Sequence, residues 1–203
     1  MSSKEPVRPK PWTLIKDEQV FECPYFTTRR DQVRDGAGQP RQYHHVRMKN
    51  FGIAVMPIDR EGHTILVGQQ RYLLDKFTWE VVRGGGQLDV SALDSAKREL
   101  SEETGYEANQ WQQIFTASAS PGVTDEIALG FVAWDLREGA PHPDAQEDLL
   151  QWRLPFAAVV SMALAGTLAD LASISLVLGI QLMCDRGQLP SDLIECLNTR
   201  RSS

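Results

Sequence analysis

The stretch KRELSEETGY, residues 97–106, places three glutamates within five positions of one another, namely Glu99, Glu102 and Glu103. If the stretch is helical, offsets of three and four residues bring all three carboxylates onto one face of the helix. Their mutual repulsion must then be offset by basic neighbours or by bound cations. The stretch therefore allows two interpretations: a solvated acidic face, or a magnesium site in which carboxylate oxygens and water bind a hard cation.

Local signals predict that a helix spans residues 92–104. Ser91 and Asp94 fit a capping box at its start, and Gly105 follows its end as a left-handed cap. An apolar stripe at helical spacing runs between these ends through Leu93, Ala96 and Leu100. The three glutamates are therefore expected to share one helix face.

The segment before this helix favours a binding site. Gly84, Gly85 and Gly86 follow shortly after TWEVV, residues 78–82, a β-branched and aromatic run that predicts a buried strand. Glycine permits a close approach that a side chain would block. The expected order is strand, glycine loop and acidic helix, which supports the magnesium interpretation over the solvated face.

This order resembles the Nudix hydrolases, whose box reads Gly, five residues, Glu, seven residues, then Arg-Glu-aliphatic-x-Glu-Glu-x-Gly-aliphatic. The matching positions are Gly84, Arg98, Glu99, Leu100, Glu102, Glu103 and Gly105, with Tyr106 at the last apolar position. One charged position departs, because Val90 stands where the family has its first glutamate. In the family that glutamate mainly pairs with the arginine of the box. Asp94 or Asp89 is therefore expected to pair with Arg98 instead.

The composition agrees with one globular domain. The 203 residues are 42% hydrophobic and 24% charged, ordinary values for a soluble protein. The net charge, 21 − 27 = −6, argues against broad nucleic-acid binding. Cys23, Cys184 and Cys196 are odd in number and lack metal-ligand spacing, which favours free thiols in the cytoplasm. The N-terminus is polar and proline-rich, and the apolar run at residues 168–183 is too short to span a bilayer, so neither a signal peptide nor a membrane span is expected.

The remaining pattern predicts an α/β fold. Strands are predicted at residues 18–34, 41–49, 51–58, 63–72, 78–82, 111–119 and 126–136, and further helices at 155–165 and 168–185. A helix among strands, with more helices at the end, predicts an α/β/α sandwich around a mixed sheet, and the Nudix resemblance implies the same fold. The expected organisation is a β-rich N-terminal extension over 1–49, a Nudix domain over 50–186 and a tail over 187–203.

The β-rich extension resembles the ADP-ribose pyrophosphatase and nucleotide-sugar group of the family, which builds a homodimer with it. QQRYLLDKFTWEVVRGGG, residues 69–86, is similar to the segment that leads into the box in that group, and Pro121 stands sixteen residues after Gly105, as in ADP-ribose enzymes. VVRGGG departs from the usual Leu-Pro-Ala-Gly, which leaves the substrate open. The alternatives are another nucleotide substrate, such as a nucleoside triphosphate or dinucleoside polyphosphate, and a module that binds ADP-ribose without cleaving it.

The resemblance also assigns roles to individual residues. The expected metal ligands, for Mg²⁺ or alternatively Mn²⁺, are Glu99, Glu103, Glu102 and the backbone carbonyl of Arg83. The expected catalytic residues are Glu102, Glu147 and Arg98. The general base stays open among Glu147, Asp144, Asp148, Glu126 and Glu102.

A nucleotide sugar is the expected substrate. The candidate substrate-binding residues are Arg71, Gly84, Gly85, Glu80 and Pro121. Arg71 could clamp a phosphate, since guanidinium matches phosphate oxygens bidentately, or it could form a surface salt bridge.

Overall fold

A computed structural model describes residues 8–139 and 149–198 of the chain. The chain divides into two compact units. Unit 1 comprises Met1–Lys49 and Ser120–Glu126, and unit 2 comprises Asn50–Ala119 and Ile127–Ser203. The short segment Ser120–Glu126 thus joins the N-terminal extension, an association that its position in the sequence did not indicate.

Unit 1 is an antiparallel sheet built around one central strand. Its strands are β1 (Thr13–Lys16), β2 (Gln19–Glu22), β3 (Phe26–Arg34) and β4 (Pro40–Met48). Strand β3 pairs with each of the other three. The predicted hairpin turn at DGAGQP connects β3 to β4, and there the side chain of Asp35 accepts hydrogen bonds from the backbone of Ala37 and Gln39. The segment predicted as one strand over 18–34 is divided between β2 and β3.

Strand β4 also holds the segment Ser120–Glu126. Four hydrogen bonds tie the two together: Val46 N to Val123 O at 2.8 Å, Asp125 N to Val46 O at 3.4 Å, Met48 N to Asp125 Oδ1 at 2.8 Å, and Tyr43 Oη to Gly122 O at 3.0 Å. The loop that contains Pro121 is therefore fixed by the N-terminal extension.

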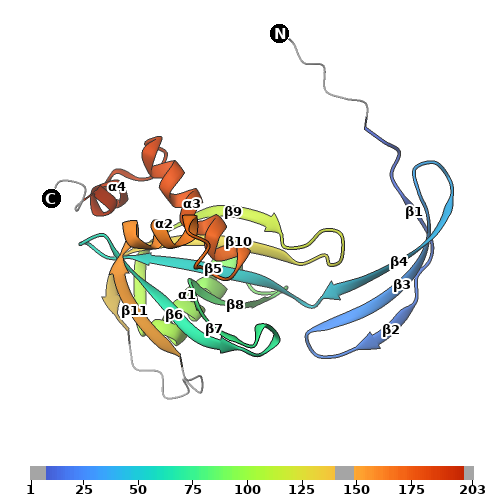
Figure 1. Ribbon diagram of the computed structural model, residues 1–203, viewed down its shortest axis with the longest axis horizontal. Helices are drawn as coiled ribbons and strands as arrows, with labels where there is room; N and C mark the ends of the chain where they lie inside the picture. The colour runs from blue at the N-terminus through green and yellow to red at the C-terminus, as the bar shows by residue number, and fades with distance from the viewer. Residues whose placement is uncertain (1–7, 140–148, 199–203) are drawn as a thin grey trace, which may run out of the picture. The chain divides into compact units, whose positions relative to one another are not determined.

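Unit 2 contains two sheets and four helices in its described part (Figure 1). Its strands are β5 (Asn50–Ile58), β6 (His63–Arg71), β7 (Lys76–Glu80), β8 (Val82–Gln87), β9 (Tyr106–Ser118), β10 (Ile127–Glu138) and β11 (Leu150–Pro155). Its helices are α1 (Ala92–Thr104), α2 (Phe156–Leu164), α3 (Leu171–Asp185) and α4 (Ser191–Asn198), with the short 3₁₀ turn η1 (Tyr72–Leu74) after β6. One sheet has the order β8-β5-β10-β9 and is mixed, because β5 and β10 are parallel. The other has the order β11-β6-β7 and is antiparallel.

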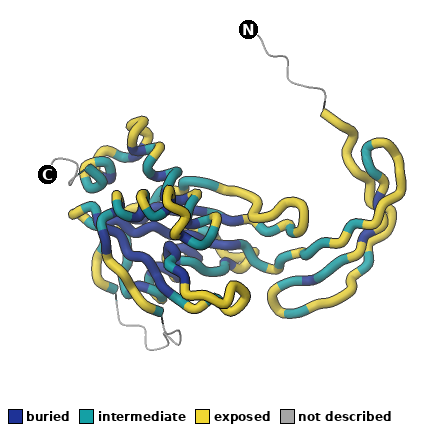
Figure 2. Tube along the Cα trace, viewed as in Figure 1, coloured by how far each residue is buried: buried dark blue, intermediate teal, exposed yellow. Residues whose placement is uncertain are grey.

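Alternating side chains of β5 supply two separate cores, which is what the period of two in a strand requires. Ile53 and Val55 pack with Ala96 and Leu100 of α1. Their neighbours along the strand, Ala54, Met56 and Ile58, pack with residues of α2, α3 and α4. Figure 2 shows the buried stretches concentrated along these central strands. The predicted α/β/α sandwich around a mixed sheet is confirmed.

Three local predictions need correction. The glycine run lies within strand β8, opposite Phe51 to Ile53 of β5, and does not form a loop. The run TWEVV is interrupted at Val81, between β7 and β8. Residues 191–198, predicted to lie in a tail, form α4, whose Leu193 is fully buried in the core. Among the described helices, none is long and apolar enough to cross a bilayer.

Candidate active site

Helix α1 has the limits that its capping signals predicted. The side chain of Ser91 accepts a hydrogen bond from Asp94 N at 3.1 Å, and Gly105 ends the helix with a φ of 74°. Glu99 is buried, whereas Glu102 is exposed and Glu103 is half-buried. The glutamates of the box therefore differ in their surroundings although they belong to one helix.

The outer edge of β8 faces the glutamates of α1. Arg83 N donates to Glu103 Oε2 at 3.1 Å, and the backbone N–H of Gly85 donates to Glu99. Gly85 O accepts from Arg98 Nη2 at 2.8 Å. In an antiparallel pair, every second residue turns both its N–H and its C=O away from the partner strand. The carbonyl of Arg83 therefore points to the same side as its N–H, towards the helix that carries Glu103.

Gly84 makes room for the carboxyl group of Glu99. A Cβ built on Gly84 would overlap that carboxyl group, so no larger residue fits there without displacing Glu99. Glu99 is 7% exposed. Burial raises the pKa of Glu99, an effect that the neighbouring Arg98 opposes and Glu102 reinforces. The first glycine of the box is thus required by close packing against a glutamate rather than by a turn.

Arg98 bridges two glutamates and the edge of β8. Its guanidinium donates to Glu99 Oε1 and to Glu102 Oε2, each at 2.6 Å, in addition to Gly85 O. The predicted pairing of Arg98 with Asp94 is wrong. The carboxylate of Asp94 instead accepts from Ser91 Oγ at 2.7 Å and lies 3.9 Å from Lys97 Nζ. The hydrogen bond to the Gly85 carbonyl at the strand edge holds the Arg98 guanidinium near Glu99 and Glu102, away from the start of the helix.

Arg71 and Glu80 form a bidentate ion pair. Arg71 Nε lies 2.8 Å from Glu80 Oε1, and Arg71 Nη2 lies 2.5 Å from Glu80 Oε2. Burial by itself would raise the pKa of Glu80, but hydrogen bonds from Arg71 and Thr78 outweigh it and hold the pKa below its usual value. The pair raises the pKa of Arg71, and the charges of Asp170 and Glu103 act in the same direction. These charged groups therefore lie within electrostatic reach of one another.

Asp170 is a member of this cluster that the sequence did not reveal as a site residue. It caps α3 by accepting from Ser173 N at 2.9 Å, and its Oδ1 accepts a hydrogen bond from Arg83 Nη1. Ser173 Oγ in turn accepts from Val81 N at 3.1 Å. The helix predicted over residues 168–185 includes Asp170, whereas the structure places Asp170 at the N-cap of α3. Its partner is 87 positions away.

Several predicted residues do not belong to this arrangement as described. Glu147, Asp144 and Asp148 lie outside the described residues. Pro121 and Glu126 belong to unit 1.

The donors around β8 fit a hard divalent cation by their chemistry, because magnesium and manganese accept carboxylate and carbonyl oxygens. Glu99 and Glu103 lie along the strand edge to which the Arg83 carbonyl points. Within residues 8–139 and 149–198, no three His, Cys, Asp or Glu side chains are grouped closely enough to hold a metal ion as they stand. Glu99 and Glu102 each bind Arg98 through one carboxylate oxygen, and an ionised carboxylate has a second oxygen that can accept from another partner.

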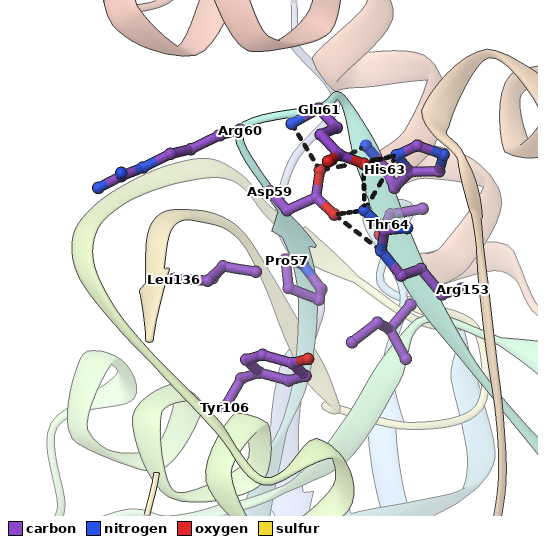
Figure 3. Close-up of a pocket in the computed structure, with 10 residues that line it drawn as sticks. Pro57, Asp59, Arg60, Glu61, His63, Thr64, Tyr106, Leu136 and Arg153 are labelled. Atoms are coloured by element: carbon purple, nitrogen blue, oxygen red, sulfur yellow. Dashed lines mark hydrogen bonds and ion pairs between the residues drawn. The ribbon is translucent and has the colours of Figure 1, made fainter. Parts of the chain in front are cut away.

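A cavity of about 360 Å³ lies elsewhere in unit 2, at the turn between β5 and β6 (Figure 3). None of the predicted site residues lines it. On its wall, Arg153 donates to the side chains of Asp59 and Glu61 and contacts His63 Nδ1 at 3.2 Å. Arg153 therefore pairs with acidic side chains of the same cavity wall. The glutamates of α1, in contrast, face the edge of β8 together with Arg83 and Arg98.

The fold and the box define the class of the protein. Residues 48–173 match the NUDIX domain, and the chain belongs to the Nudix family. The expectation of a Nudix hydrolase is confirmed.

Two relatives and one solved structure extend this result. An ADP-ribose pyrophosphatase of Mycobacterium tuberculosis is 31% identical over 174 residues, which cover 82% of this chain and 81% of the relative. A methanol dehydrogenase activator of Bacillus methanolicus is 34% identical over 144 residues, which cover 69% of this chain and 77% of the relative. The crystal structure of an ADP compounds hydrolase superposes with a TM-score of 0.76 at 22% identity, covering 91% of this chain and all of that chain. The last comparison supports the fold.

Proposed function

We propose that this protein hydrolyses the pyrophosphate bond of a nucleoside diphosphate sugar, with ADP-ribose as the leading substrate and AMP and ribose 5-phosphate as the products. The observation that carries the proposal is the seating of Glu99 and Glu103 along the edge of β8, with Arg71 within electrostatic reach of Glu103. Glu99 and Glu103 can bind a cation, and Arg71 can bind a phosphate. Together these groups are suited to a substrate that contains a diphosphate. The similarity to an ADP-ribose pyrophosphatase favours ADP-ribose among such substrates.

The proposed cofactor is Mg²⁺, with Mn²⁺ as the alternative. Glu99, Glu103, Glu102 and the Arg83 carbonyl would hold it, and when bound it supplies neutralisation of phosphate charge and a bound water of lowered pKa. Arg71 would bind a phosphate oxygen with the part of its guanidinium that Glu80 does not use. Gly85 would let the diphosphate approach the backbone, and Gly84 would act through the space that it leaves for the Glu99 carboxyl group.

Arg98 would set the position of the acids by holding Glu99 and Glu102 against β8. For the general base we propose Glu147, because Glu102 is already bonded to Arg98. Asp144, Asp148, Glu126 and Glu102 are the alternatives. Pro121 stays a proposed substrate-binding residue and lies in the loop that β4 holds.

The decisive experiment is incubation of the intact chain with a panel of nucleotide sugars, nucleoside triphosphates and dinucleoside polyphosphates, with and without Mg²⁺. We expect cleavage of ADP-ribose that requires the cation, with AMP and ribose 5-phosphate as products. Faster cleavage of a triphosphate or of a dinucleoside polyphosphate would change the substrate class. Binding of ADP-ribose without any product would identify a sensor instead of an enzyme. Mass analysis after reaction in oxygen-18 water would show which phosphorus is attacked.

We also propose that the protein is a cytoplasmic homodimer whose interface includes unit 1. Val33 is the single buried apolar residue in the described part of unit 1. Several large apolar side chains of its strands are more than half exposed: Leu14, Ile15, Val20 and Phe21. A sheet with so little core needs another surface to cover it. A second copy of the chain supplies such a surface.

A further inference from the structure

We propose that Arg83, aimed by Asp170, is a second arginine that binds the diphosphate of the substrate, so that its side chain acts in addition to its backbone carbonyl. The inference rests on the proposed function and adds a residue to it. It concerns the one position directly before the first glycine of the box, where this chain carries a guanidinium.

Arg83 is held at two points that face different parts of unit 2. Its backbone N–H is bonded to Glu103 of α1, while its Nη1 donates to Asp170 at the start of α3. The side chain is mostly buried, at 23% exposure. Neighbouring residues of a strand point to opposite faces, and Val82 packs in the α1 core. Arg83 therefore extends its side chain towards α3 while its backbone borders the acids of α1.

One nitrogen of each arginine remains available to a ligand. Glu80 uses Nε and Nη2 of Arg71, and Asp170 uses Nη1 of Arg83. Arg83 Nε is buried and has no hydrogen-bonding partner, whereas this is not the case for Arg83 Nη2, which is therefore either exposed or bonded. Within residues 8–139 and 149–198, neither Arg71 Nη1 nor Arg83 Nη2 has a hydrogen-bonding partner. Each guanidinium is thus fixed by a carboxylate and keeps one amino group for a further acceptor.

The two fixed guanidiniums belong to the same charged cluster. Val81, the neighbour of Glu80, donates to Ser173 Oγ at 3.1 Å, and Ser173 N donates to Asp170 at 2.9 Å, so the two ion pairs lie near each other. The charge of Asp170 accordingly acts on Arg71, and the charge of Arg83 acts on Glu80. A diphosphate has two phosphoryl groups, and each can accept from one guanidinium. Because carboxylates hold both side chains in place, little side-chain freedom remains to be lost on binding. A ligand with a single phosphate would bind only one of the two guanidinium groups.

The test compares Arg83→Gln and Arg83→Lys with the intact wild-type chain. The probe is the α,β-methylene analogue of ADP-ribose, which cannot be cleaved between its phosphates, titrated calorimetrically in the presence of Mg²⁺. We expect Arg83→Gln to weaken binding of the analogue by about ten- to a hundredfold, the effect of losing a charge-assisted hydrogen bond. The KM for ADP-ribose should rise by a similar factor, and binding of AMP should change less.

Arg83→Lys separates a binding role from a structural one. Lysine can keep the ion pair with Asp170 and hence the packing of α3, but it lacks the second amino group. We expect it to fold like the wild type and still bind the analogue about fivefold or more weakly, because an ammonium cannot reproduce the fork of the guanidinium. Asp170→Asn should also weaken binding of the analogue, because the Arg83 guanidinium then loses the carboxylate that fixes its orientation.

Two controls accompany these variants. Arg60→Gln removes one exposed arginine of unit 2, which is paired with Asp135, and should leave binding of the analogue unchanged. Mn²⁺ binding without nucleotide, measured by electron paramagnetic resonance, should stay within about twofold in Arg83→Gln because the backbone carbonyl is retained.

The outcomes distinguish this inference from the proposed function. Wild-type affinity for the analogue in both Arg83 variants, with the wild type cleaving ADP-ribose, would overturn the role of Arg83 alone. Equal losses of Mn²⁺ and analogue affinity would overturn it too, because they would indicate a structural role. A wild-type chain that neither binds nor cleaves any nucleotide sugar would overturn the proposed function itself.

Discussion

At the scale of single residues, the candidate site depends on the ion pairs and hydrogen bonds that each charged side chain forms. Arg98 bonds Glu99, Glu102 and the Gly85 carbonyl, and it thereby links the acidic helix face to the strand edge. Carboxylates held in place in this way can act on a charged substrate without first losing side-chain freedom. Charge placement within the box is therefore set jointly by α1 and β8.

Glu103→Gln should lower kcat for ADP-ribose by about a hundredfold or more, as expected when a contact that stabilises charge in the transition state is lost. The amide can still accept a hydrogen bond from Arg83 N, so the fold should be retained. The measurement is the steady-state rate at saturating Mg²⁺. Glu107→Gln is the matched control, because Glu107 pairs with Arg137 and should tolerate the change. Near-normal turnover in Glu103→Gln would reject its assignment to the metal.

Asp94→Ala should leave the Mg²⁺ requirement unchanged. Asp94 bonds Ser91 in the capping box and does not contact Arg98. Its loss should therefore reduce the free energy of unfolding by about 0.5–1 kcal/mol through the weakened cap, which urea denaturation would measure. Magnesium titration of the activity provides the second measurement. A clearly raised Mg²⁺ requirement would mean that Asp94 supports Arg98 in solution after all.

At the scale of elements, strand β8 and helix α1 form one unit of function. The helix needs the strand to seat Glu99 and Glu103, and the strand needs glycine where Glu99 is seated. A strand interior is an unfavourable place for consecutive glycines. The close approach of the Glu99 side chain explains the glycine at position 84, and the ring of Phe51 occupies the space that a Cβ on Gly86 would need.

Gly84→Ala should strongly reduce activity while having a smaller effect on folding. The added Cβ would overlap the Glu99 carboxyl group, and the displaced side chain would lose its contacts with Arg98 and Gly85. We expect kcat to fall by about a hundredfold, comparable to removal of a stabilising carboxylate. Activity and thermal unfolding should be measured together. Wild-type activity in the alanine variant would show that Glu99 does not need this seat.

The same elements show how far the sequence predicts the structure. Helix α1, predicted over about residues 92–104, spans Ala92–Thr104, and the prediction succeeded because its cap, periodicity and terminal glycine are all local signals. The glycine run was predicted as a loop, since pairing with β5 and contact with Glu99 are tertiary and override local preference. The partner of Arg98 was misassigned for the same reason. Asp170 was missed because no local pattern connects it to Arg83.

At the scale of the whole molecule, the N-terminal extension does more than add strands. It holds the segment Ser120–Glu126 through β4, so deletion of residues 1–49 would release a loop of the hydrolase chain as well as remove the surface proposed to form the dimer. Loss of activity after such a deletion would therefore have two explanations. Point substitutions on exposed positions separate them.

The double variant Leu14→Asp, Phe21→Asp should convert a dimer into a monomer. Leu14 pairs with Val33 and Phe21 with Thr28. Val33 and Thr28 lie on opposite faces of β3, so the two substitutions place charge on both faces of the sheet. Both side chains are more than half exposed, and the folded chain alone should tolerate the change, whereas an apolar interface should not.

Light scattering should give twice the 22.7 kDa chain mass for the wild type and the single mass for the variant. Thr13→Asp, at an exposed polar position in β1, controls for added charge and should remain dimeric. The single variants would identify the face that forms the contact, and a monomeric wild type would reject the dimer.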